Sequence, residues 1–134
     1  MKQVIQAILA ATMLATLCGA ARAGDKVEAP VTLETNAQGQ VTRAYGMIAS
    51  ARNSADSQQL IGCYLSASGS LLRAGCEARN AAGVSTLCFS THPNIVAAAQ
   101  AVGPDSYIDF NRDASGNCTA LYVANNSVNP VKQP

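Results

Sequence analysis

The chain has 134 residues, and its nine Lys and Arg against eight Asp and Glu give a formal net charge of +1 at pH 7. A chain so close to neutral lacks the basic surface with which proteins bind nucleic acids or anionic membranes. Its length fits one domain. Aromatic residues make up only 4% of the sequence and Trp is absent, so we expect a core of Ala, Leu, Ile and Val that buries less apolar area than an aromatic core.

The first 23 residues have the pattern of a secretory signal peptide. Lys2 precedes the apolar run VIQAILAATMLATLCGA, and Ala21-Arg22-Ala23 is a small-x-small cleavage pattern. After cleavage we expect a linker at 24–30, a single small disulfide-stapled domain at 31–124 and an extended C-terminal tail at 125–134. No later apolar run in the sequence is long enough to span a bilayer. The sequence therefore predicts a protein exported to the periplasm or beyond.

A four-residue turn pattern recurs between the strand-like runs. It begins with Asn, Asp or Ser, has Ala second and ends in Gly, as NAQG at 36–39, SASG at 66–69, NAAG at 80–83 and DASG at 113–116. The first side chain accepts a backbone hydrogen bond, and Gly takes the positive φ of a hairpin turn without penalty. Short runs rich in β-branched and aromatic residues flank each turn. Four hairpins with six or seven antiparallel strands follow.

One segment, at 93–102, has the pattern of a helix. Pro93 suits its first position, with Thr91 or His92 as the N-cap, and Gly103-Pro104 forms the stop. The sequence therefore predicts an α+β domain, mostly antiparallel β-sheet with one short helix.

Four cysteines remain after the signal peptide, at 63, 76, 88 and 118. An even number in an exported chain indicates two disulfides, whereas a zinc site would usually show a C-x-x-C spacing that is absent here. If Asn80 faces Val84 across the third turn, Cys76 lies opposite Cys88, which favours a Cys76–Cys88 bond and leaves Cys63 to Cys118. The rival pairing, Cys63–Cys76 with Cys88–Cys118, stays open because a bulge shifts the register by one residue.

The stretch DFNRDASGN at 109–117 offers a weak calcium candidate. Asp109, Asn111 and Asp113 alternate like the first ligands of a calcium loop. The loop needs Gly at its sixth position and Glu at its twelfth, where the chain has Ala114 and Ala120. A plain hairpin turn is the favoured interpretation, and we predict no metal and no cofactor.

Candidate catalytic residues are few. His92 is the only histidine, and beside a helix start it usually acts as a cap or a surface residue. Glu77 with Asp109 or Asp113 is the acid/base pair that the sequence suggests, although with so few acidic residues a chance pair is the better explanation. The polar run SARNSADS at 50–57 is a candidate binding loop through Arg52, Asn53 and Asp56. The alternative is a connection whose short side chains bond their own backbone.

The segments SARNSADSQQLIGC, CEARNAAG and NCTALYVANNS together resemble a group of small exported bacterial proteins with no assigned activity. This resemblance covers most of the chain after the signal peptide. It implies export and a compact disulfide-bearing domain, and it carries over no catalytic residue and no ligand.

From these observations we expect an exported binding or interaction module with a protein partner, and an inhibitor-like role is one concrete version of it. This interpretation is favoured by the small size of the chain, its predicted disulfides and its near-neutral net charge. The sequence also lacks a recognisable set of catalytic residues. One alternative is a small hydrolase that uses His92 or the Glu77/Asp109 pair. Another is a structural or surface protein.

Overall fold

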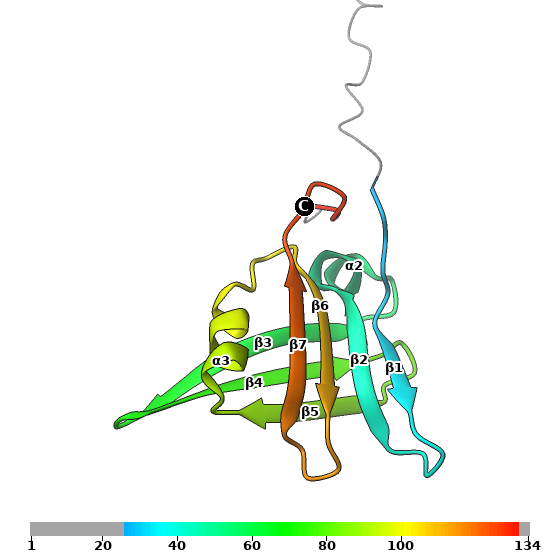
Figure 1. Ribbon diagram of the computed structural model, residues 1–134. Helices are drawn as coiled ribbons and strands as arrows, with labels where there is room; N and C mark the ends of the chain where they lie inside the picture. Colours follow the sequence, from blue (N-terminus) through cyan, green and yellow to red (C-terminus); the bar gives the residue numbers. More distant parts are fainter. Residues whose placement is uncertain (1–25, 132–134) are drawn as a thin grey trace, which may run out of the picture.

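The computed structural model describes residues 26–131, so the predicted signal peptide lies outside the described residues. Within these residues strands predominate, and two short helices interrupt them (Figure 1). In chain order the elements are β1 (Thr32–Thr35), β2 (Val41–Met47), α2 (Ile48–Asn53), β3 (Leu60–Ser68), β4 (Leu71–Arg79), β5 (Ser85–Ser90), α3 (Pro93–Gln100), β6 (Tyr107–Arg112) and β7 (Cys118–Ala124).

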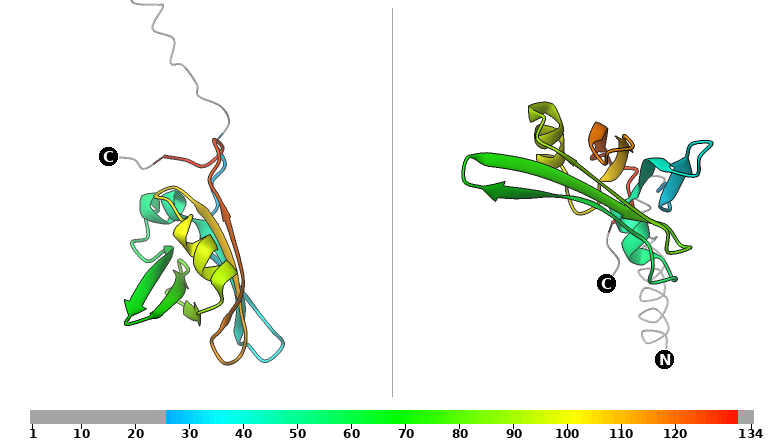
Figure 2. Two further views of the ribbon diagram at one scale, coloured as in Figure 1. Left: turned by 60° about the vertical axis from the view of Figure 1, so that its left-hand side comes forward. Right: turned by 90° about the horizontal axis from the view of Figure 1, so that it is seen from below.

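The strands form two antiparallel sheets. One has four strands in the order β1-β2-β6-β7, and the other has three in the order β3-β4-β5. The sheets face each other with their strands crossing, and the β3–β4 hairpin extends well past the edge of the four-stranded sheet (Figures 1 and 2). The predicted class, mostly antiparallel sheet with a short helix and two disulfides, is confirmed.

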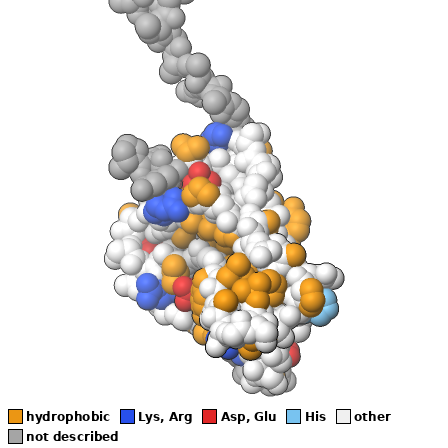
Figure 3. Space-filling view, turned by 90° about the vertical axis from the view of Figure 1, so that its left-hand side faces the viewer, with side chains coloured by type: hydrophobic (Ala, Val, Ile, Leu, Met, Phe, Trp, Pro, Cys, Tyr) orange, Lys and Arg blue, Asp and Glu red, His pale blue; other side chains and the backbone are white. Residues whose placement is uncertain are grey.

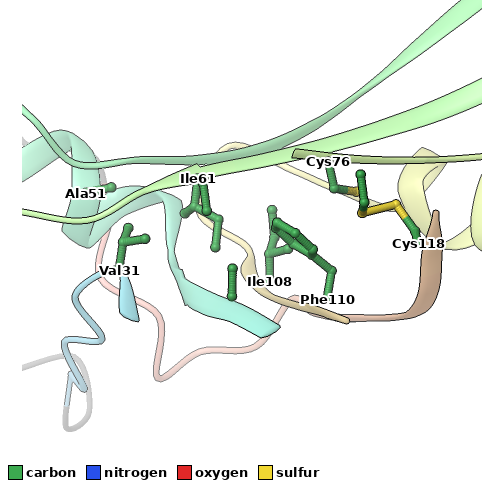
Figure 4. Close-up of a cluster of buried hydrophobic side chains, with 10 residues drawn as sticks. Val31, Ala51, Ile61, Cys76, Ile108, Phe110 and Cys118 are labelled. Carbon is green, nitrogen blue, oxygen red and sulfur yellow. A yellow bond between two sulfur atoms is a disulfide. The ribbon is translucent and has the colours of Figure 1, made fainter. Parts of the chain in front are cut away.

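The core lies between the two sheets and is assembled from alternate residues of each strand. Ile61 and Cys76 point from the three-stranded sheet toward Ile108 and Phe110 of β6 (Figure 4). Phe110 and Ile108 are the largest side chains with no exposed surface. As the composition predicts, small residues fill much of the rest: Ala44, Ala51 and Ala78 belong to the same cluster.

The predicted turns are present, with one difference. Gly39, Gly83 and Gly116 have φ of 75°, 80° and 84°, and in each turn the leading Asn or Asp accepts backbone hydrogen bonds through its side chain. The SASG stretch at 66–69 differs, because β3 runs on to Ser68 and pairs it with Leu71. Only Gly69 and Ser70 make that turn, with Gly69 at φ 58° as the first central residue of a type II′ turn requires.

The helix expected at 93–102 is present as α3. Pro93 is its first residue, and Nδ1 of the His92 N-cap accepts a hydrogen bond from the backbone N–H of Asn94 at 3.3 Å. The shorter α2 is a second helix, which the sequence analysis did not predict, and it follows directly after β2. Its residues Ala49 and Ala51 are buried, and Ala51 belongs to the core cluster between the sheets. Burial and the high helix propensity of Ala favour a helix at this position.

The disulfides are Cys63–Cys76 and Cys88–Cys118, so the favoured pairing of Cys76 with Cys88 is wrong. The register behind that prediction is correct, since Cys76 does lie opposite Cys88. Cys76 is on a central strand, however, and also lies opposite Cys63, with a Cα–Cα distance of only 4.1 Å. That short distance marks a non-hydrogen-bonded pair, in which side chains are closest, and Cys88 is left to join Cys118 of the other sheet.

The segments that flank the sheets are held to the domain by hydrogen bonds. The backbone N–H of Met47 donates to the carbonyl of Ala29, and that of Val27 donates to the carbonyl of Val128. Asn129 is buried, and its amide nitrogen donates to the carbonyls of Asp105 and Ala124. The two ends of the described chain therefore lie side by side, as Figure 1 shows at the top of the molecule.

Candidate binding face

The outer face of the four-stranded sheet gathers three of the four tyrosines around an ion pair. We call this surface, made of Arg43, Tyr45, Tyr107, Asp109 and Tyr122, the tyrosine face. In each strand these residues alternate with core residues, so their side chains point away from the core. The register places Tyr45, Asp109 and Tyr122 in one row across β2, β6 and β7.

Arg43 and Asp109 form the polar centre of the tyrosine face. The guanidinium donates through Nε and Nη2 to the two carboxylate oxygens at 2.9 and 2.6 Å, the bidentate geometry that arginine makes best. Nη1 donates to Glu34 at 3.2 Å, and the guanidinium stacks 4.7 Å from the ring centroid of Tyr45. The hydrogen bond with Asp109 is the largest cause that raises the pKa of Arg43 above its already high value. Arg43 is therefore held in one orientation and stays charged.

Two tyrosines extend the face toward β7. The rings of Tyr107 and Tyr122 pack edge to face, with their centroids 6.3 Å apart. Tyr122 has 61% of its surface exposed. Partial burial raises the pKa of Tyr107, and the nearby charge of Asp109 raises it further, so its hydroxyl is a hydrogen-bond donor at neutral pH. A shallow depression of about 330 Å³ lies between Arg43, Asp109, Asn111 and Tyr122.

The three calcium candidates do not converge. Asp109 and Asn111 lie on β6, where Asp109 is already paired with the cation Arg43. The carboxylate of Asp113 turns back into its own hairpin, where it accepts from the backbone N–H and the side-chain amide of Asn117 at 2.8 and 2.9 Å. Among residues 26–131, no group of three or more His, Cys, Asp or Glu side chains is placed to hold a metal ion.

The candidate binding loop uses its polar side chains within the chain. Arg52 donates to the carbonyl of Pro104 at 2.9 Å and pairs with Asp105 at 3.5 Å, and Asn53 donates to the carbonyl of Val131. Asp56 accepts from the backbone N–H groups of Gln58 and Gln59 and from the side-chain amide of Gln59. These contacts hold the connection between α2 and β3 in shape. A ligand site in this loop stays a prediction.

Asp56 and Asp113 make the stability of the folded protein depend on pH in the acidic range. Hydrogen bonds lower the pKa of both carboxyls below the usual 3.8. The largest cause is the hydrogen bond from the Gln59 side chain for Asp56 and the one from the Asn117 side chain for Asp113. A carboxyl with a depressed pKa in the folded state contributes stability above the unfolded pKa and loses it as pH falls through the folded pKa. We expect the melting temperature to fall as pH drops below about 4. Asp56→Asn with Asp113→Asn should flatten this dependence, measured by thermal denaturation from pH 7 to pH 2.

The candidate catalytic residues are not brought together. Glu77 lies on the outer face of the three-stranded sheet, because its neighbours Cys76 and Ala78 are in the core, whereas Asp109 lies on the outer face of the other sheet. The core separates their carboxylates, so they form no acid/base pair. His92 uses Nδ1 to cap α3.

The sequence contains a signal for the tyrosine face, although the sequence analysis above does not predict this face. Arg43 and Tyr45 are two residues apart, as are Tyr107 and Asp109, and this spacing puts each pair on one side of a strand. What the spacing does not show is that β2 and β6 are neighbours. Within the described part of the chain, no helix is both long enough and apolar enough to cross a membrane. Comparison with protein-family models, with characterised proteins and with solved structures finds no match to this chain.

Proposed function

We propose that the chain is an exported binding module that recognises a protein partner through the tyrosine face. The observation that carries the proposal is the exposed Tyr122 ring, packed on Tyr107 beside the fixed Arg43–Asp109 pair. Tyr and Arg are the residues most enriched among those that dominate binding energy at protein interfaces. A tyrosine side chain also presents a large rigid ring at a low cost in conformational entropy.

The shape of the surface favours a protein over a small molecule. Small-molecule ligands are usually enclosed in deep, mostly apolar cavities, whereas the tyrosine face is the outside of a sheet with one shallow depression. Because Arg43 is fixed by Asp109, Glu34 and Tyr45, little ordering would be required when a partner docks. Such a preformed, stapled surface is what an inhibitor-like module needs.

Export is supported by the chemistry of the cysteines. All four cysteines of the described chain are in disulfides, which persist in the periplasm and outside the cell and are rare in the cytosol. The signal-peptide pattern at 1–23 agrees with this location. The proposed setting is therefore the periplasm or the medium.

The test is affinity capture followed by a binding titration. The oxidised exported protein is immobilised, exposed to native periplasmic and secreted fractions, and the retained protein is identified and titrated. We expect Tyr122→Ala to weaken binding by about 30-fold or more, the effect of losing a contact worth roughly 2 kcal/mol. Leu87→Ala is the matched control, because Leu87 is an exposed apolar side chain on the other sheet. Equal binding by Tyr122→Ala and the wild type would exclude the tyrosine face.

A further inference from the structure

Three of the four cysteines of the described chain lie in one row across the three-stranded sheet. Cys63 of β3 lies opposite Cys76 of β4, and Cys76 lies opposite Cys88 of β5. Residues directly opposite each other on neighbouring strands carry their side chains on the same face of a sheet. The three side chains therefore point toward the other sheet, where Cys118 completes the second disulfide. Figure 4 shows Cys76 beside the disulfide that ends at Cys118.

Cys76 is placed to form a disulfide with either of its neighbours in this row. The Cα atoms of directly opposed residues in an antiparallel sheet are about 4.5–5.5 Å apart, and disulfides usually join Cα atoms about 4.4–6.8 Å apart. In the structure Cys76 is bonded to Cys63, and Cys88 is bonded to Cys118. A bond between Cys76 and Cys88 would therefore keep the present register of β4 and β5.

The four cysteines differ in their access to solvent. Cys76 and Cys88 have no exposed surface and Cys118 has 5%, whereas Cys63 is only partly buried. Cys63 also lies on the first strand in the order β3-β4-β5, so no strand of residues 26–131 covers the outer side of its backbone. A thiolate opens a disulfide by attacking one of the two sulfur atoms, and access to that sulfur limits the rate. A thiol from solution should therefore attack Cys63, with Cys76 as the leaving group.

The face of the β3–β4 hairpin next to Cys63 is open. Leu65 follows Cys63 by two residues, so it lies on the same face, and Leu72 lies further along that face on β4. Their side chains are 41% and 38% exposed. The side of the molecule that carries the hairpin tip shows such hydrophobic side chains gathered at its surface (Figure 3). A small thiol can thus approach Cys63 along this face without displacing a strand.

We propose that Cys76 is the centre of a thiol-triggered disulfide exchange. In the first step the thiolate of a low-molecular-weight thiol bonds to Cys63, and Cys76 leaves as a thiolate. In the second step Cys76 attacks Cys88, which forms a Cys76–Cys88 bond and releases Cys118 as a thiolate. Each step breaks one S–S bond and forms one, so no oxidant or reductant is consumed. The small thiol stays on Cys63 as a mixed disulfide, and Cys118 takes up the proton that this thiol loses.

The exchange removes the covalent link between the two sheets. Cys88–Cys118 joins β5 to β7, whereas Cys76 and Cys88 both belong to the three-stranded sheet. After the exchange the sheets are held together by the shared core and by contacts such as the hydrogen bond from the N–H of Phe89 to the carbonyl of Gly116 at 2.9 Å. The four-stranded sheet, which carries the tyrosine face, is then no longer stapled. We expect the exchanged form to melt at a lower temperature than the native form, because it loses the bridge that closes the longer loop.

Single-cysteine variants test the second step without an added thiol. Cys63→Ala leaves a free Cys76 thiol beside Cys88–Cys118, and Cys76→Ala is the matched control, because its free thiol is on Cys63, one strand further from Cys88. Both proteins are held at about pH 8, where thiolate is available, then alkylated and mapped by mass spectrometry. We expect alkylation of Cys118 to be at least about tenfold greater in Cys63→Ala than in the control. Equal alkylation of Cys118 in both variants would overturn the proposal.

A second measurement uses the wild-type protein, so it does not depend on how a variant folds. The oxidised protein is exposed to reduced glutathione at about pH 8, and samples are quenched with acid at intervals and mapped. We expect the first exchanged species to carry glutathione on Cys63, a Cys76–Cys88 bond and a free Cys118. A free Cys76 that accumulates while Cys88–Cys118 stays intact would contradict the exchange. First attack at Cys88 or Cys118 would contradict entry at Cys63.

Discussion

Replacing both Cys88 and Cys118 by Ala will lower the melting temperature more than replacing both Cys63 and Cys76 by Ala. Cys88–Cys118 joins the two sheets across 30 residues, whereas Cys63–Cys76 lies within one hairpin and spans 13. On the loop-entropy model the longer bridge contributes about 3.6 kcal/mol and the shorter about 2.9 kcal/mol. For a domain of this size, the loss of the longer bridge corresponds to a drop of roughly 15–25 °C.

The geometry of the two bridges gives a second reason for this order. The three-stranded sheet keeps its β3–β4 register through backbone pairing of all nine residues without the Cys63–Cys76 bond. The two sheets, in contrast, are joined at β5 and β7 mainly by Cys88–Cys118 and one isolated bridge between Phe89 and Asn117. Thermal denaturation followed by circular dichroism measures both double variants. Equal melting of the Cys88/Cys118 variant and the wild type would contradict a role of this bridge in holding the sheets together.

Phe110→Ala is expected to be the most destabilising single substitution. The Phe110 ring has no exposed surface and lies between the sheets, where Ile61 and Cys76 face it (Figure 4). Removing such a ring costs about 3–5 kcal/mol through lost burial and the cavity that remains. Small domains are stable by only about 5–15 kcal/mol. The other residues of this cluster are mostly Ala, Ile and Cys, and within residues 26–131 no second buried aromatic ring compensates for the loss.

Tyr122→Ala is the matched control for Phe110→Ala. It removes an aromatic ring from the neighbouring strand β7, but that ring is exposed on the tyrosine face. We expect urea denaturation to show a loss of several kcal/mol for Phe110→Ala and less than about 1 kcal/mol for Tyr122→Ala. In the capture experiment the order should reverse, with Tyr122→Ala losing the partner while it stays folded. Similar stability losses for both variants would show that Tyr122 supports the fold.

Local chemistry made several elements predictable from the sequence. The Asn and Asp turns ending in Gly39, Gly83 and Gly116 depend on one side-chain acceptor and one positive φ, and both are properties of adjacent residues. The α3 helix likewise begins with Pro93 and ends before Gly103. The turn expected at 66–69 lies two residues later, because β3 continues through Ser68. The backbone pairing of these residues with β4 outweighs the local turn preference of SASG.

The features that bear on function depend on which strands are neighbours, and adjacent residues carry no record of that. The sequence by itself determined the turns, the α3 helix, the number of disulfides and the alternation that puts Arg43 with Tyr45 and Tyr107 with Asp109 on one side of their strands. Only the tertiary structure decided that Cys76 bonds to Cys63 and that β2 lies beside β6 to assemble the tyrosine face. It also decided that β3 is left as an edge. The physical reason is that a central strand offers each residue two cross-strand neighbours, and the packing of the two sheets selects between them.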